Sequence, residues 1–371
     1  MIVKNGTVFQ EDQTFSRRDL YIENGKIVDS STSITDTTVI DAQGLYVLPG
    51  LVDIHSHGAV GHDFSDGNLD GLKEILAYEY AHGVTSYCPT SMTIEKELLQ
   101  KLFRSMGDWE DQPGLSHVAG INMEGPFLDV SRKGAHRPEC ILPPDVDFFR
   151  ECNASCGKRI RLVTLAPNVE GAMDFIRALS GDVTISLGHS AADYDTARKA
   201  IQAGADHVTH LYNAMNPLGH RAPGIIGAAS ESDTCVAELI CDGIHVHESM
   251  VRVAFKLFPG RIALISDSMR ATGMENGTYD LGGQQVTVNG RLATLADGTI
   301  AGSATNVYDC MKMAVSFGIP LEEAITAATM TPAKSIGIYD EVGSLTPGKR
   351  ADVILVDKDL NLVKVVGAGA A

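Results

Sequence analysis

Eight short apolar runs rich in β-branched residues alternate with amphipathic, helix-like segments through the middle of the chain. Continuous apolar strands that alternate with amphipathic helices are typical of a parallel sheet covered on its outside. Eight such units predict a TIM-type (β/α)8 barrel. A doubly wound open sheet is the alternative, but no GxGxxG motif follows the first run. The runs occupy residues 51–57, 84–91, 117–124, 161–167, 183–189, 206–212, 235–242 and 261–267.

The two ends of the chain have a different pattern, of short segments in which apolar and polar residues alternate. Near the N-terminus these segments surround an Asn24-Gly25 turn, and a similar pattern follows residue 344. Chain ends often lie close together, so both pieces can complete one sheet domain. We therefore predict a small discontinuous β-sandwich domain from residues 1–48 and 345–371, beside a metal-dependent barrel domain of residues 49–344.

In five of the eight runs, a histidine or a carboxylate at or near the C-terminal end is a candidate site residue. This is the end of a barrel at which the fold builds active sites. The residues are His55 and His57 in the first run, then Glu124, His189, His210 and Asp267.

The first run ends in His55-Ser56-His57, and residues i and i+2 of a strand point to the same face. Both imidazoles can therefore bind one metal at the mouth of the barrel. Two structural histidines near a loop are the alternative.

Glu124 ends an apolar run, where a carboxylate is costly unless it is paired or binds a cation. A salt bridge to a loop lysine or arginine is its alternative role.

His189 and His210 would each pass alone as core histidines. Together with Glu124 they form a His/His/carboxylate set that suits zinc or ferrous iron. Asp267 can exchange protons with a metal-bound water, although a helix N-cap explains an aspartate at this place equally well.

The formal net charge of −17 predicts that the protein binds neither nucleic acid nor anionic membranes. An anionic substrate must then be held by a local cluster of donors. Seven scattered cysteines and an N-terminus without signal-peptide features predict a reduced, cytoplasmic protein.

A series of motifs runs along almost the whole chain. In order, they are PGLVDIHSHG, GINMEGPFL, KGAHRPE, SLGHS, THLYNAM, ICDGIHVH, SDSM and DGTIAGS. Together they resemble the N-acetylglucosamine-6-phosphate deacetylases of the amidohydrolase superfamily. HxH and the KRADVILVD tail are shared across that superfamily, whereas EGPFL with KGAH, and THLYNAM with GHRAPG, are closer to this one family. Asp267-Ser268 departs from the Asp-Ala that relatives often have.

The resemblance implies a role for each matching position. Asp267 would be the catalytic acid/base, and His136 would polarise the acetyl carbonyl. The main metal ligands would be Glu124, His189 and His210, with His55 and His57 at a second site, so that one or two divalent ions, zinc or iron, bind each chain. The substrate would contact Ala135, the backbone of Asn213 and Ala214, the side chains of Arg221 and His245, and the loop Ile300, Ala301 and Gly302.

The implied activity is hydrolysis of the acetyl amide of N-acetylglucosamine-6-phosphate. In the family the arginine that matches Arg221 is associated with the subunit interface, so the resemblance implies a homodimer. The alternatives are another amidohydrolase, acting on N-acyl amino acids or cyclic amides, and a non-catalytic scaffold on the same barrel.

Overall fold

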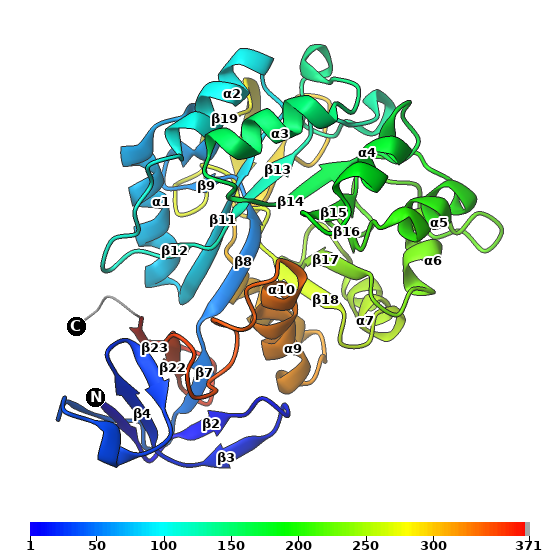
Figure 1. Cartoon of the computed structure of the whole chain (residues 1–371). Helices are drawn as coiled ribbons and strands as arrows, with labels where there is room; N and C mark the ends of the chain where they lie inside the picture. Colours follow the sequence, from blue (N-terminus) through cyan, green and yellow to red (C-terminus); the bar gives the residue numbers. More distant parts are fainter. Residues whose placement is uncertain (368–371) are drawn as a thin grey trace.

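The computed structural model describes residues 1–367, and its larger part is a nearly closed barrel of eight parallel strands (Figure 1). Closure between the last and first strands depends on two contacts at their ends. The amide of Asp267 donates to the carbonyl of His55 (2.9 Å), and the amide of Ser266 donates to Oδ1 of Asp53 (3.4 Å). The strands are β8 (Leu51–Ser56), β11 (Val84–Ser91), β13 (Ile121–Glu124), β14 (Ile160–Leu165), β15 (Thr184–Leu187), β16 (His207–Val208), β17 (Val236–Ile240) and β18 (Ile262–Ile265).

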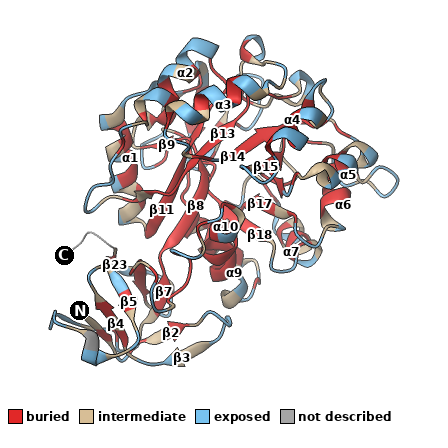
Figure 2. Cartoon of the chain, in the orientation of Figure 1, coloured by how far each residue is buried: buried red, intermediate tan, exposed pale blue. Residues whose placement is uncertain are grey.

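All eight predicted runs form barrel strands, so the barrel is confirmed and the doubly wound alternative is wrong. The third run is interrupted at Ala119–Gly120, which separates β13 from a short strand, β12 (His117–Val118), that also pairs with β11. Figure 2 shows that the barrel strands are buried along most of their length, as their continuous apolar pattern predicts; Arg161 in β14 is an exposed exception.

The helices pack around the barrel with their exposed faces toward solvent (Figures 1 and 2). The side chains of Asn68, Asp145 and Asp193 accept backbone N–H groups and so fix the starts of three of them. The helices are α1 (Leu69–Ala81), α2 (Lys96–Ser105), α3 (Val146–Ser155), α4 (Ala172–Leu179), α5 (Tyr194–Ala203), α6 (Gly224–Ser230), α7 (Glu248–Leu257), α8 (Val307–Ser316), α9 (Leu321–Ala328) and α10 (Met330–Ser335).

The two chain ends together form two sheets below the barrel in Figure 1, with strand orders β5-β4-β1-β6 and β23-β22-β7-β2-β3. Val3 and Leu20 from one sheet and Val47 and Val353 from the other share one core, so the sheets form a sandwich. The predicted boundaries at 48 and 345 stay a prediction, and residues 368–371 of the second piece lie outside the described residues. The strands are β1 (Ile2–Lys4), β2 (Thr7–Phe9), β3 (Phe15–Arg17), β4 (Leu20–Glu23), β5 (Lys26–Val28), β6 (Val39–Asp41), β7 (Tyr46–Pro49), β22 (Val353–Val356) and β23 (Leu362–Val366).

An insertion that the sequence analysis did not predict follows β18. It is an antiparallel sheet of β19 (Gly277–Leu281), β20 (Gln284–Asn289) and β21 (Leu292–Thr294). A second small hairpin, β9 (Gly58–Ala59) with β10 (His62–Asp63), follows β8. Both follow the C-terminal end of a barrel strand.

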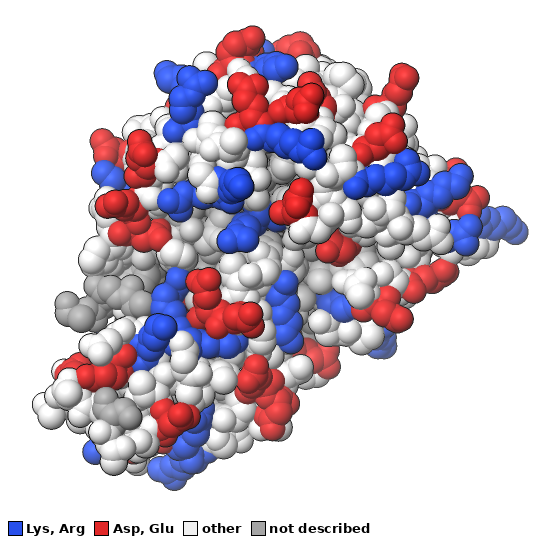
Figure 3. Space-filling model, in the orientation of Figure 1, with Lys and Arg blue, Asp and Glu red and all other residues white. Residues whose placement is uncertain are grey.

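Acidic and basic side chains are intermingled on the face drawn in Figure 3. Within residues 1–367, no helix combines the length and apolar character that crossing a membrane requires.

Candidate active site

A cavity of about 290 Å³ opens at the C-terminal ends of the barrel strands and gathers most of the predicted site residues. His55 is fully buried within the adjoining cluster, whereas Arg221 is exposed and does not line the cavity. The lining also includes Met92, Gly134, Leu281 and Thr299, which the sequence analysis did not select. The predicted residues on the lining are His57, Glu124, Ala135, His136, His189, His210, Asn213, Ala214, His245, Asp267, Ile300, Ala301 and Gly302.

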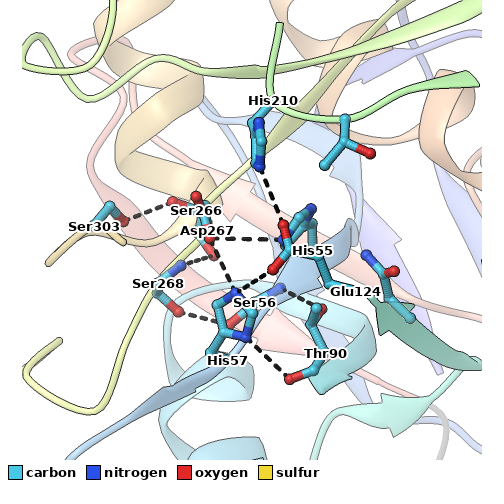
Figure 4. Close-up of polar contacts among 12 residues, drawn as sticks. His55, Ser56, His57, Thr90, Glu124, His210, Ser266, Asp267, Ser268 and Ser303 are labelled. Carbon is cyan, nitrogen blue, oxygen red and sulfur yellow. Dashed lines mark hydrogen bonds and ion pairs between the residues drawn. The ribbon is translucent and has the colours of Figure 1, made fainter. Parts of the chain in front are cut away.

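The carboxylate of Glu124 is the centre of the cluster (Figure 4). Its Oε1 lies 3.0 Å from Nε2 of His189 and 3.1 Å from Nε2 of His210, and these two nitrogens are 2.9 Å apart. Its Oε2 lies 3.2 Å from Nε2 of both His57 and His136. One carboxylate therefore faces two groups of imidazoles, one through each oxygen.

Local backbone geometry turns the side chains toward this centre. His189, His210 and Asp267 each follow the last residue of a barrel strand by two positions, and each has positive φ, at 46°, 28° and 48°. Non-glycine residues rarely adopt this conformation, and it clusters at functional sites. Neither the amino-acid types nor their spacing reveal it.

Three of the histidines are held so that Nε2 can bind a metal. Nδ1 of His57 faces the carbonyl of Thr90 at 3.1 Å, and Nδ1 of His189 faces the carbonyl of Arg132 at 2.9 Å. Nδ1 of His55 faces a carboxylate, that of Glu238, at 2.9 Å. Because Nδ1 donates in each case, Nε2 of the neutral imidazole carries no proton and can bind a metal through its lone pair.

His136 has the opposite arrangement. Its Nδ1 accepts a hydrogen bond from the backbone N–H of Thr93 (3.2 Å), so the proton of a neutral imidazole must be on Nε2. That N–H faces the cavity and Oε2 of Glu124. Possible ligand atoms of His136, Glu124 and His189 lie within 4.8 Å of one another, but the neutral imidazole of His136 presents an N–H to the cavity and not a lone pair.

The cluster compensates its own charges. Burial opposes the charged form of Glu124, yet the surrounding histidines hold the pKa of this carboxyl well below its usual range. Burial likewise opposes the protonation of His57, but Asp267 and Glu124 raise its pKa to about 10. The proton on His57 therefore supplies positive charge that a bound metal cation would otherwise supply.

Asp267 faces the same centre from the end of β18, with Oδ1 3.3 Å from Nε2 of His57. Burial would raise its pKa, but the hydrogen bond from His57 and the charges of nearby imidazoles lower it to about 2. The hydroxyl of Ser268, the departure from the family pattern, points away from this carboxylate. It bonds Oγ of Ser56 (2.6 Å) and donates to the carbonyl of Gly58 (2.9 Å) (Figure 4).

Two further parts of the chain contribute to the cavity lining. Nδ1 of His245 is 2.7 Å from Oδ2 of Asp242, which leaves its Nε2 without this partner. Burial opposes ionisation of Asp242, but this contact holds its pKa below the usual value. The insertion contributes Leu281, and the side-chain amide of Gln284 donates to the carbonyl of Ala135.

Glu238 in β17 contacts two residues of the cluster and was not predicted from the sequence. It is fully buried, and its Oε2 accepts from Nδ1 of His55 (2.9 Å) and from the backbone N–H of His210 (3.0 Å). A single carboxylate inside the apolar run CVAELICD was the signal that could have identified it.

We expect Glu238→Gln to lower the affinity of the folded protein for divalent metal by roughly 10–100-fold, the usual effect of losing a group that orients a ligand. The neutral amide orients His55 less firmly and lowers the basicity of its Nε2. Metal titration followed by elemental analysis measures this, with Glu97→Gln on the exposed face of α2 as the control. Unchanged metal affinity would contradict the positioning role.

Comparisons with known proteins agree with the fold and with the motifs. A model described as the amidohydrolase family matches residues 46–370. N-acetylglucosamine-6-phosphate deacetylase of Bacillus subtilis (strain 168) is 36% identical over 381 residues, covering 100% of this chain and 96% of the relative. N-acetylgalactosamine-6-phosphate deacetylase of Escherichia coli O157:H7 is 34% identical over 362 residues, covering 94% and 96%.

Among solved structures, a mutant of the N-acetyl-D-glucosamine-6-phosphate deacetylase from Mycobacterium smegmatis, in complex with N-acetyl-D-glucosamine-6-phosphate, matches with a TM-score of 0.91. The two sequences are 32% identical, and the match covers 100% of this chain and 98% of that one. These matches confirm the resemblance seen in the motifs. The chain therefore belongs to the amidohydrolase family of hydrolytic enzymes.

Proposed function

We propose that this enzyme removes the acetyl group of N-acetylglucosamine-6-phosphate by hydrolysis and releases acetate and glucosamine-6-phosphate. The convergence of Glu124, Asp267 and four of the five cavity-lining histidines in one cluster carries the proposal. The relatives with this activity, and the complex of the Mycobacterium smegmatis enzyme, support the substrate class.

The residues fit a divalent metal, zinc or iron, with one or two ions in each chain. His189, His210 and Oε1 of Glu124 would hold one ion, and His55, His57 and the same carboxylate would hold a second. Nε2 of His55 has no hydrogen-bond partner among the described residues, as a site for a cation requires. Bound there, a divalent ion lowers the pKa of a water molecule and polarises the acetyl carbonyl.

The side chains would handle the protons and the charge that develops. Asp267, ionised at neutral pH, accepts the proton of the attacking water and later gives it to the departing amine, which leaves poorly as an anion. Nε2–H of His136 donates to the acetyl oxygen as negative charge grows on it. The backbone of Asn213 and Ala214, with His245, would receive the phosphate, while Ile300, Ala301 and Gly302 line the sugar.

Acetate release measured by a coupled assay tests the proposal, on protein whose metal content is determined in the same sample. We expect rapid release from N-acetylglucosamine-6-phosphate and much slower release from unphosphorylated N-acetylglucosamine. N-acetylgalactosamine-6-phosphate is included because one relative bears that name. No release from either phosphorylated sugar by metal-loaded protein would refute the proposal and favour N-acyl amino acids or cyclic amides.

Asp267→Asn should leave metal content unchanged and lower kcat by roughly 10²–10⁴-fold, the usual effect of a positioned proton-transfer group. The amide keeps the shape of the side chain but cannot accept the water proton. Elemental analysis and steady-state kinetics measure both quantities on one preparation. Near-normal turnover in a folded, metal-loaded variant would remove Asp267 from the mechanism.

His136→Asn and His189→Asn should differ, because the two imidazoles have opposite tautomers. We expect the first to keep its metal and to lose about 10²–10³-fold in kcat, the effect of removing one oxyanion donor. The second should lose metal together with activity. If His136→Asn loses metal as readily as His189→Asn, then His136 is a ligand and the assignment is wrong.

Arg221 would complete the phosphate site of a second subunit in a homodimer. It is exposed in the single chain, beside His220, and a guanidinium suits phosphate oxygens. Arg221→Ala should lower kcat/KM for the phosphorylated sugar by roughly 10–100-fold, with little change for the unphosphorylated one. Equal losses on both substrates would assign Arg221 to the fold or the catalytic centre.

Mixing subunits tests the contact between chains. Hybrid dimers of Asp267→Asn and Arg221→Ala contain one site with both native residues if Arg221 acts in the partner's site. We therefore expect the mixture to exceed the summed activity of the two variants. An active, strictly monomeric enzyme would contradict this part of the proposal.

The seven cysteines, all unpaired and buried, support a reducing compartment such as the cytoplasm.

A further inference from the structure

A second cavity, of about 270 Å³, lies at the end of the barrel opposite the Glu124 cluster. Its wall is formed by Ser86 of β11, by β12 and the two residues that follow it, by the start of β14 with the residues before it, by residues 338–342 after α10, and by Arg350 before β22. It shares no lining residue with the active-site cavity and has almost the same volume.

The lining of this cavity is basic although the chain as a whole has a net charge of −17. Lys158, Arg159, Arg161 and Arg350 line it together with a single carboxylate, that of Glu341. Throughout residues 1–367, no carboxylate lies within ion-pairing distance of the first three of these cations. Figure 3 shows blue side chains around the junction of the barrel with the small sandwich, with a few red ones among them.

Contacts with neutral groups hold two of these arginines in place without compensating their charge. The guanidinium of Arg159 donates to the carbonyl of Trp109 (2.7 Å). The stem of Arg161 lies against Gly120, where an added Cβ would be 2.4 Å from its Cγ. Glycine at the break between β12 and β13 therefore makes room for this arginine.

Arg350 has a different role in the wall. Its Nε and Nη2 bind Oδ2 of Asp352 at 2.7 and 2.6 Å, and Nη2 also donates to Oγ of Ser86 (2.7 Å). It thus ties β11 to the segment that enters the sandwich. The net uncompensated charge of the cavity comes from Lys158, Arg159 and Arg161.

We propose that this cavity binds a small phosphorylated anion at a site separate from the catalytic one. Neighbouring cations repel one another, and a dianion between them relieves that repulsion through charge-assisted hydrogen bonds. The planar guanidinium groups suit phosphate oxygens. Glu341 can accept a hydrogen bond from a hydroxyl of the same ligand, which favours a phosphorylated sugar over free phosphate.

Calorimetric titration of metal-loaded protein with inorganic phosphate and with glucose 6-phosphate tests the site. Wild type is compared with Lys158→Ala/Arg161→Ala, and with Lys101→Ala/Arg104→Ala, two exposed cations of α2, as the matched control. We expect the cavity variant to weaken one binding event by at least about tenfold, while the control and the KM for the phosphorylated substrate do not change. Tighter binding of glucose 6-phosphate identifies a sugar phosphate, and equal binding identifies the phosphate group alone.

The proposal is overturned if wild type binds neither probe at millimolar concentration. It is also overturned if the cavity variant binds both probes with wild-type affinity and stoichiometry. A loss of binding accompanied by an equal rise in KM would mean that the substitutions disturb the active site, and would equally contradict a separate site.

Discussion

A buried carboxylate is stable only when positive charge surrounds it, and Glu124 imposes this requirement at the centre of the barrel mouth. The imidazoles of His57, His136, His189 and His210 lie within 3.2 Å of its oxygens. Protonated His57 supplies positive charge there, whereas burial keeps His189 neutral by lowering its pKa to about 4. A divalent cation meets the requirement better, because the imidazoles that bind it can then be neutral while His136 stays a donor. The same arrangement thus explains both the electrostatics and the chemistry.

What distinguishes one histidine from another is the group behind it. Carbonyls of Thr90 and Arg132 and the carboxylate of Glu238 receive Nδ1–H and leave Nε2 free. The amide of Thr93 reverses this pattern at His136. Four residues outside the cavity lining therefore decide which imidazoles can bind a metal and which one can donate to a substrate. The rigid barrel strands keep these partners in place.

The sequence predicted the barrel and the paired chain ends because both depend on local pattern, whereas most of the substrate side of the cavity was predicted from the family resemblance. Apolar runs identified the strands, and the rule that barrel sites lie at strand ends brought Glu124, His189 and Asp267 together. The histidine tautomers could not be predicted, since they depend on contacts between segments far apart in the sequence, such as His136 with Thr93.

Glu238 and the sheet β19–β21 were missed because a lone carboxylate in a strand and an insertion between repeats leave weak signals in the sequence. Arg221 was placed in the site by resemblance, and the single chain leaves it outside the cavity.

If Glu124 joins two metal positions, as proposed, the metal content of the protein follows from it. Elemental analysis of fully loaded wild type should then approach two ions per chain, because His55 and His57 would add a second position beside His189 and His210. Replacing His55 and His57 together by alanine should reduce the content to one ion, with the fold unchanged. Wild type that saturates at one ion, or a double variant that loses both, would contradict a Glu124 carboxylate shared by two metal positions.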